Sequence, residues 1–263
     1  MTMLEALGLS ARLCGILAVV QSLEFLALYK TYSDSGIWKW VDLKKELSSS
    51  SQILASVFGL FMRPRMFFIW NVIRIVAGVA LFFKAHFALL LFLLVLHFVT
   101  LIRWRGTFNG GSDYMNVIVL GGCTLAFAFP ENFYVVMGAL SYISFQLSLS
   151  YFKAGYLKVL EPSWRSGTAL TDFVNNPSYQ QNRVSRFLAQ APGVMFVLTW
   201  MVLLFEVLFP LSVLSPSMSL GFIGFAGLFH LGNVYLFGLN RFFWSWLSAY
   251  PCFYFVSLYL HSL

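Results

Sequence analysis

Four ionisable side chains lie at the end of a long apolar segment near the middle of this chain. Residues 151–167, with the sequence YFKAGYLKVLEPSWRSG, contain Lys153, Lys158, Glu161 and Arg165. Only 10% of the residues of the protein are charged, so such a group is unusual here. A lysine at the centre of a membrane helix costs about 2.5–3.5 kcal/mol on insertion scales, and an ionisable residue at membrane depth is therefore a candidate for function.

Lys158 has two interpretations. A lysine at a helix end can extend its ammonium to the lipid headgroups, and this simpler interpretation suits Lys153 well. Gly155, Pro162 and Gly167, however, predict a turn that folds this segment back into a helical bundle. A neutral amine buried there could serve as a general base. The residues alone leave both interpretations open.

Other polar side chains interrupt apolar runs elsewhere, and we expect them to turn inward and pair with one another because lipid offers no partners. For Glu24, Arg74 and Glu206 we expect a structural ion pair, either Glu24–Arg74 or Glu206–Arg74. Gln21 lies on the same helix face as Glu24, three residues before it. His97 has no polar neighbour in sequence and is predicted to be a hydrogen-bonded packing histidine.

His230 and Asn233 lie one turn apart on one face of the same predicted helix. The amide of Asn233 can fix the tautomer of the imidazole or hold a ligand carbonyl, which would make the pair a binding site. The alternative is that the two side chains only connect neighbouring helices by hydrogen bonds.

The elements that position these residues are predicted to be membrane helices. The mean hydropathy is +0.78, 59% of residues are hydrophobic and 29 are Phe. A soluble domain of 263 residues has too little interior for this much apolar surface. We predict an all-α, multi-pass integral membrane bundle that forms one domain over residues 1–263. The three cysteines show no metal-ligand spacing, so no metal site is expected: Cys14, Cys123 and Cys252.

Apolar runs of bilayer-spanning length predict about eight transmembrane helices. They lie near residues 11–29, 66–83, 85–102, 114–129, 133–157, 192–214, 219–239 and 243–261. Residues 51–62 are too few to span and are predicted to form an interfacial or half-inserted helix.

The formal charge of +7 is distributed unevenly over these spans. One side holds Lys30, Lys39, Lys44, Lys45, Arg63, Arg65, Arg103, Arg105, Lys153, Lys158, Arg165, Arg183, Arg186 and Arg241. The other side holds only Arg12 and Lys84. The positive-inside rule makes the basic face cytoplasmic and puts both termini on the opposite side. Topology and anionic lipid headgroups account for this basicity, so membrane lipids are the expected partners and a nucleic-acid partner is not expected.

Three segments resemble a known family. Residues 154–167 are similar to the A-G-x-x-K and W-x-x-G block of the vitamin K-dependent gamma-carboxylase-like membrane domain, or HTTM family. Residues 229–242 resemble its F-H-x-x-N-x-x-L-F-x-I-G-x-F block, which 248–253 continue. Residues 109–114, Asn-Gly-Gly-Ser-Asp-Tyr, match a family loop that precedes an apolar helix. The resemblance is strongest over 100–255. The lysine block alone is weak, but two blocks in register are fairly specific.

The resemblance implies an enzyme-like bundle in which Lys158 occupies the position of the carboxylase general base. There the base deprotonates a reduced naphthoquinone, and reaction with oxygen yields an alkoxide that removes a proton from a peptide glutamate before carbon dioxide adds. The implied cofactor is therefore a reduced, naphthoquinone-like quinone. The substrate- or lipid-binding residues expected around Lys158 are His230, Asn233, Trp164, Asp113 and Tyr114.

The chain also departs from the carboxylase. Gly111 precedes Ser112 where the carboxylase has the histidine of Asn-Asn-His-Ser-Tyr. The chain lacks the large extramembrane region that binds propeptide in the animal enzyme, so gamma-carboxylation of clotting-type substrates is not expected. Bacterial members of this size resemble membrane proteins that help to mature a sporulation-delaying peptide toxin, which implies a bacterial cytoplasmic membrane. The carboxylase reacts on the lumenal side, whereas the charges here put Lys158 at the cytoplasm.

We therefore expect an enzyme or maturation factor that acts on a peptide or a quinone-like lipid, with Lys158 as general base. The alternative is a non-catalytic protein that recognises a lipid or a small partner subunit. A transporter is less favoured, because no inverted repeat or pair of broken helices is evident.

Overall fold

The protein is built from helices. The computed structural model describes residues 1–103, 110–179 and 182–263, and no strand occurs within these ranges. The expected all-α class is confirmed.

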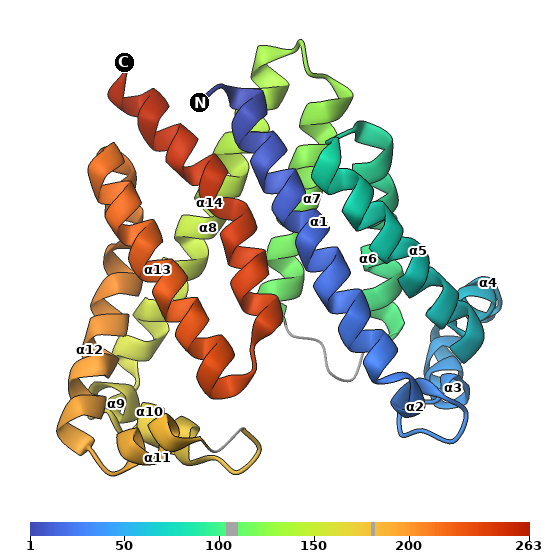
Figure 1. The fold of residues 1–263 in the computed structure, drawn as a ribbon, viewed down its shortest axis with the longest axis horizontal. Helices are drawn as coiled ribbons and strands as arrows, with labels where there is room; N and C mark the ends of the chain where they lie inside the picture. The colour runs from blue at the N-terminus through green and yellow to red at the C-terminus, as the bar shows by residue number, and fades with distance from the viewer. Residues whose placement is uncertain (104–109, 180–181) are drawn as a thin grey trace.

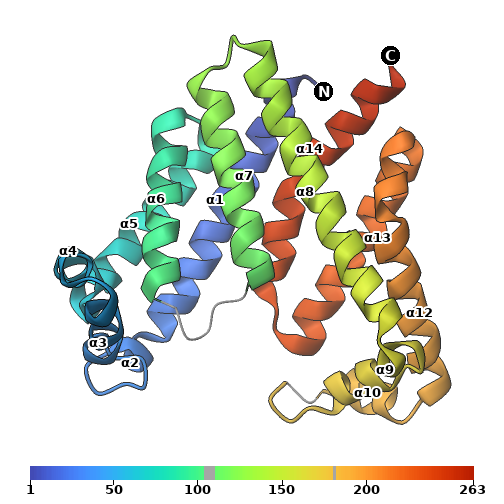
Figure 2. The ribbon, with the colours of Figure 1, turned by 180° about the vertical axis from the view of Figure 1, so that it is seen from behind.

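Eight long helices correspond to the eight predicted segments (Figures 1 and 2). They are α1 (Met3–Ala27), α5 (Pro64–Phe83), α6 (Phe87–Arg103), α7 (Gly110–Ala128), α8 (Phe133–Leu160), α12 (Pro192–Leu208), α13 (Pro216–Phe237) and α14 (Asn240–His261). A 3₁₀ turn, η2 (Phe209–Leu214), extends α12.

Side-chain capping determines where several helices begin. Thr2 forms a capping box with Glu5, so α1 begins eight residues earlier than the apolar run predicted.

Five helices are long and apolar enough to cross a membrane: α1, α5, α8, α12 with η2, and α13. Helix α6 is apolar but shorter, with 17 residues. The predicted spans 114–129 and 243–261 correspond to α7 and α14, which do not belong to this group of five, so the count of about eight spans is not confirmed.

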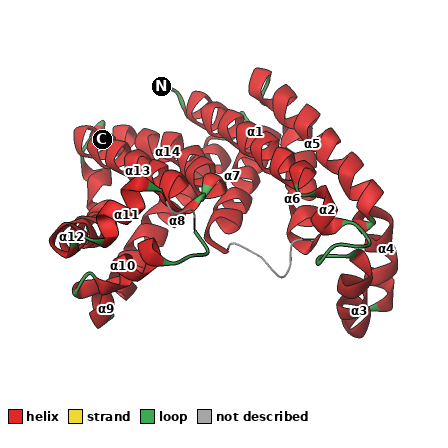
Figure 3. Ribbon diagram, turned by 60° about the horizontal axis from the view of Figure 1, so that its bottom comes forward, coloured by secondary structure: helices red, strands yellow, loops and turns green. Residues whose placement is uncertain are grey.

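Six short helices complete the described chain: α2 (Tyr29–Tyr32), α3 (Trp40–Ser50), α4 (Gln52–Met62), α9 (Pro162–Arg165), α10 (Thr168–Asn175) and α11 (Arg183–Ala189). Helix α4 covers the predicted interfacial segment, and its 11 residues are too few to span. The short helices form two separate groups, α2–α4 and α9–α11 (Figure 3). Both groups lie at one end of the bundle (Figure 1). Both termini lie at the other end (Figure 1).

Helix α14 lies at the centre of the bundle and packs on α1, α7, α8 and α13 (Figure 2). This position explains its low hydropathy. Its buried residues include hydroxyl-bearing side chains such as Ser245, Ser248 and Tyr250. A helix covered by other helices meets little lipid, and its small polar side chains allow close packing.

The outer helices expose large apolar side chains. Val76 on α5, Val197 on α12 and Leu228 on α13 are 64%, 56% and 71% exposed. Exposed apolar surface of this extent marks an interaction with membrane or protein. Together with the five candidate spans, it identifies an integral membrane protein.

Candidate functional site

A glycine on α8 brings the ionisable residues of the site together. A Cβ atom placed on Gly155 would lie 2.7 Å from the Cβ of Glu206 and 2.8 Å from the backbone nitrogen of Val207. Only a residue without a side chain therefore allows α12 to approach α8 this closely. Lys158 follows Gly155 by three residues and so lies on the same face of α8.

Lys158 forms an ion pair with Glu206 across this contact. Its Nζ lies 2.5 Å from Oε1 and 2.6 Å from Oε2 of Glu206. The Lys158 side chain is 21% exposed and the Glu206 side chain 4%. The expected Glu206–Arg74 pair is therefore wrong. The ammonium is held by a buried carboxylate of a neighbouring helix.

The turn after α8 places an indole against the same ammonium. Pro162 begins α9, and Gly167 adopts a left-handed conformation with φ 81° that reverses the chain into α10. Trp164 lies between them, and the Nζ of Lys158 is 5.1 Å from the centroid of its ring. A cation over an indole face at this distance is attracted by the quadrupole of the ring.

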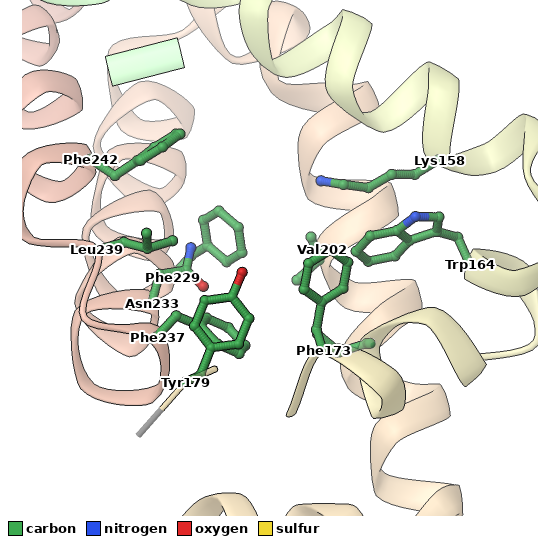
Figure 4. A pocket seen from close by; sticks show the side chains of 11 residues that line it. Lys158, Trp164, Phe173, Tyr179, Val202, Phe229, Asn233, Phe237, Leu239 and Phe242 are labelled. Atoms are coloured by element: carbon green, nitrogen blue, oxygen red, sulfur yellow. The ribbon is translucent and has the colours of Figure 1, made fainter. Parts of the chain in front are cut away.

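Lys158 and Trp164 form one wall of a pocket of about 330 Å³ (Figure 4). Helices α8, α9, α10, α12, α13 and α14 all contribute to it. Its other lining residues are Leu170, Phe173, Tyr179, Val202, Phe229, Asn233, Phe237, Leu239 and Phe242. The walls are thus mainly aromatic, and Lys158 adds an amine and Asn233 an amide. Flat apolar molecules with one or two hydrogen-bonding oxygens suit such a pocket.

His230 lies behind the pocket wall and is not one of its lining residues. Its Nε2 is 2.8 Å from the hydroxyl of Tyr151, which in turn is 2.7 Å from the hydroxyl of Tyr250. The His230 ring stacks on Phe242, a lining residue, with 6.3 Å between centroids. His230 and Asn233 therefore have different surroundings, although they lie one turn apart. The buried chain of three side chains orients His230 next to the pocket.

Arg74 lies in a second buried polar cluster, between α1, α5, α6 and α7. Its Nη2 donates to Gln21 Oε1 at 2.5 Å and lies 3.3 Å from Nδ1 of His97. Asn116 reaches the same Nδ1 at 3.2 Å. The prediction that His97 is a hydrogen-bonded packing histidine is confirmed.

Glu24 interacts with the first two residues of α14. Its carboxylate accepts a hydrogen bond from Asn240 at 3.1 Å and lies 3.6 Å from Nε of Arg241. The expected Glu24–Arg74 pair is therefore wrong as well. Glu24 is one turn beyond Gln21 at the end of α1, and at that depth α14 supplies the nearest cation.

Residues 111–114 of the third family segment do not line the pocket. The backbone carbonyl of buried Asp113 lies 3.3 Å from Nε2 of His97, while Tyr114 is 62% exposed. Asn109 lies outside the described residues. A Cβ on Gly111 would lie 3.0 Å from the ring of Phe242 and 3.2 Å from the ring of Trp246, so these two rings fill the space beside the glycine.

Sequence reasoning missed two kinds of site residue. The sequence predicts a structural pair for Glu206 and gives no indication of a role for Tyr151. Their partners are 48 and 79 residues away along the chain, so no local spacing indicates them. A single acidic residue in the apolar run 192–214 was the available signal for Glu206.

Within the described ranges, no group of three or more His, Cys, Asp or Glu could hold a metal ion.

Comparison with known proteins gives one match. The sequence model of the HTTM domain matches residues 124–257, just over half of the chain. The matched region contains Lys158, Glu206 and the His230–Asn233 segment, whereas residues 109–114 precede it. Neither the curated proteins nor the solved structures include a significant match.

Proposed function

The chain belongs to the HTTM family, a membrane protein family related to the vitamin K-dependent carboxylase, and on this premise we propose that it is a membrane enzyme or peptide-maturation factor that uses Lys158 as its base. The observation that supports this most is the Lys158–Glu206 pair at the wall of an aromatic pocket. Taking two charges out of water costs several kcal/mol per ion, and a pair retained at a pocket is a candidate for chemistry.

The pair can move a proton without changing its net charge. Transfer of one proton from the Lys158 ammonium to Glu206 leaves a neutral amine beside a neutral carboxylic acid. A low-dielectric site favours such a transfer over one that separates charge. The neutral amine of Lys158 then takes a proton from a substrate hydroxyl, and Glu206 retains the first proton until the product leaves. Glu206 thus acts with Lys158 as part of one acid–base unit.

The pocket residues match a flat, quinone-like ligand. Trp164 and Phe229 offer aromatic faces, Asn233 offers an amide for a ring oxygen, and Lys158 lies at the same cavity. A volume of about 330 Å³ is at the lower end of the range of ligand pockets. A bound reduced quinone would supply the hydroxyl to be deprotonated and the reducing equivalents. The residues of this chain would hold it, exclude water and accept its proton.

The test compares two lysines of α8. Lys158→Met should abolish the oxygen-dependent conversion of a reduced naphthoquinone, in which dioxygen is the oxidant. The oxidised product is followed by mass spectrometry, and binding of the reduced naphthoquinone should weaken at least tenfold. Lys153→Met is the matched control, because Lys153 is exposed on the same helix and lies outside the pocket. Full conversion by a folded Lys158→Met variant would disprove the role of the base.

The alternative is a non-catalytic membrane protein that recognises a lipid or a small partner subunit. The same ion pair favours it in one respect, since a buried pair can serve only to connect α8 with α12. In that case Lys158→Met combined with Glu206→Leu would keep the isolated complex intact, and co-purifying quinone would be absent.

We also propose eight crossings in a bacterial cytoplasmic membrane. Both termini lie at one end of the bundle, and the basic short helices lie at the other (Figure 1). By the positive-inside rule the end with α2–α4 and α9–α11 faces the cytoplasm. Single cysteines at the N-terminus, at 177–178 and at the C-terminus, labelled by a membrane-impermeant reagent, test this. Eight crossings require both termini to react from one side and 177–178 from the other, whereas five crossings would put the termini on opposite sides.

A further inference from the structure

A second cavity lies among residues of α2, α3 and the start of α5. Helices α2–α4 lie at the same end of the bundle as α9–α11, next to the Lys158 pocket, but on the other side of the bundle (Figure 1). The volume of the second cavity is about 710 Å³. The residues that line it are Tyr29, Ser33, Asp34, Trp40, Val41, Lys44, Arg63, Pro64, Arg65 and Met66. It shares no residue with the Lys158 pocket, so it is a separate site.

The cavity carries an excess of positive charge. Lys44, Arg63 and Arg65 contribute three cations, and Asp34 contributes one carboxylate. In the described part of the chain none of these three cations forms an ion pair, whereas Lys158 and Arg241 each have a glutamate partner. Three cations with one acid on a single concave surface are complementary to an anion.

The position of the cavity along the bundle indicates where this anion lies. Helix α5 begins at Pro64 and has 20 residues, which corresponds to about 30 Å, the thickness of the hydrocarbon core. Arg63 and Arg65 flank that start, and they therefore lie at the level of the lipid headgroups. Trp40 and Tyr29 add the aromatic rings that are typical of this interface.

From the charge, the volume and this depth, we propose that the cavity binds the phosphate of an anionic phospholipid headgroup. Lys44, Arg63 and Arg65 hold the phosphate oxygens, arginine being suited to bidentate contacts with phosphate. Val41, Met66 and Pro64 lie against the glycerol and the first acyl carbons. A free phosphate has the same charged group but no apolar part to fill the remaining cavity.

The experiment compares two pairs of arginines at the basic end. Arg63→Gln combined with Arg65→Gln removes two cations of the cavity. Arg183→Gln combined with Arg186→Gln on α11 removes two exposed cations elsewhere, so both variants lose the same net charge. Phosphatidylglycerol is titrated into the detergent-purified full chain, and its binding is measured by native mass spectrometry. Each basic residue near an anionic surface contributes roughly 1 kcal/mol, so the first variant should bind about 30-fold more weakly than the wild type.

The control variant should bind phosphatidylglycerol with nearly wild-type affinity. Equal loss in both variants, or no loss in the Arg63→Gln/Arg65→Gln variant, would overturn the site. Inorganic phosphate distinguishes the two sources of the anion. Failure of about 10 mM phosphate to displace the lipid supports a phospholipid, and complete displacement overturns that assignment. All four arginines are exposed, so unchanged thermal unfolding should accompany each variant.

Discussion

Replacement of Gly155 by alanine should separate α8 from α12 and loosen the Lys158–Glu206 pair. The new Cβ would lie 2.7 Å from the Cβ of Glu206 and 2.8 Å from the backbone nitrogen of Val207. Real Cβ atoms do not approach this closely, and neither contact is the end of a flexible side chain. One of the helices must therefore shift.

The change in the free energy of unfolding follows from two opposing terms. Overpacking of a close contact costs roughly 1–3 kcal/mol, and a backbone atom at 2.8 Å puts Gly155 near the upper limit. Alanine in place of glycine favours the helix by about 0.8–1.0 kcal/mol. The free energy of unfolding should therefore fall by about 2 kcal/mol.

Gly138 on the same helix is the matched control, because a Cβ there would meet nothing within 4 Å. Gly138→Ala keeps the helix-propensity gain of about 0.8–1.0 kcal/mol without the clash. The two variants should then differ by about 3 kcal/mol, a difference that isolates the packing term.

The assay is unfolding by sodium dodecyl sulfate in mixed micelles, followed by far-ultraviolet circular dichroism. As a second readout, the amine of Lys158 should react faster with an acylating reagent in the Gly155→Ala variant than in the wild type. Equal stabilisation by both alanines, with unchanged reactivity of Lys158, would refute the close approach at Gly155.

Three further changes probe the site and its surroundings. Lys158→Met and Glu206→Leu should each lower the free energy of unfolding by about 3–5 kcal/mol, because each leaves a buried charge unpaired. The double variant should lower it by less than either single change. Additive losses of stability in the same micelle assay would contradict the pairing. Tyr151→Phe removes two buried hydrogen bonds and should cost about 1–3 kcal/mol, whereas Tyr142→Phe at a 52% exposed position should change the unfolding free energy little. Gly167→Ala puts a residue with a Cβ at φ 81° and should destabilise the turn after α9 by roughly 1–2 kcal/mol. The variant should therefore be cleaved faster by a protease at this turn. Cleavage at the same rate as in the wild type would contradict the strain.

Long apolar runs were sufficient to predict the long helices α1, α5–α8 and α12–α14, because bilayer thickness sets the length of a spanning segment. The short helices α2, α3 and α9–α11 lie in more polar segments and were not predicted. Prolines at the start of α5, α12 and α13 set boundaries that local chemistry explains. The number of crossings was harder to predict from hydropathy. Helix α14 is covered by other helices, so its composition reflects internal packing more than contact with lipid.

The partners of the ionisable residues were determined by the tertiary structure. From composition and local blocks, the sequence indicated a membrane protein of the HTTM family and marked Lys158 as a candidate base. It could not show that Glu206 faces Lys158 while Arg74 bonds Gln21 and His97. The rotation and closest approach of packed helices decide such pairs. In this protein the approach of α8 to α12 depends on the missing side chain of Gly155.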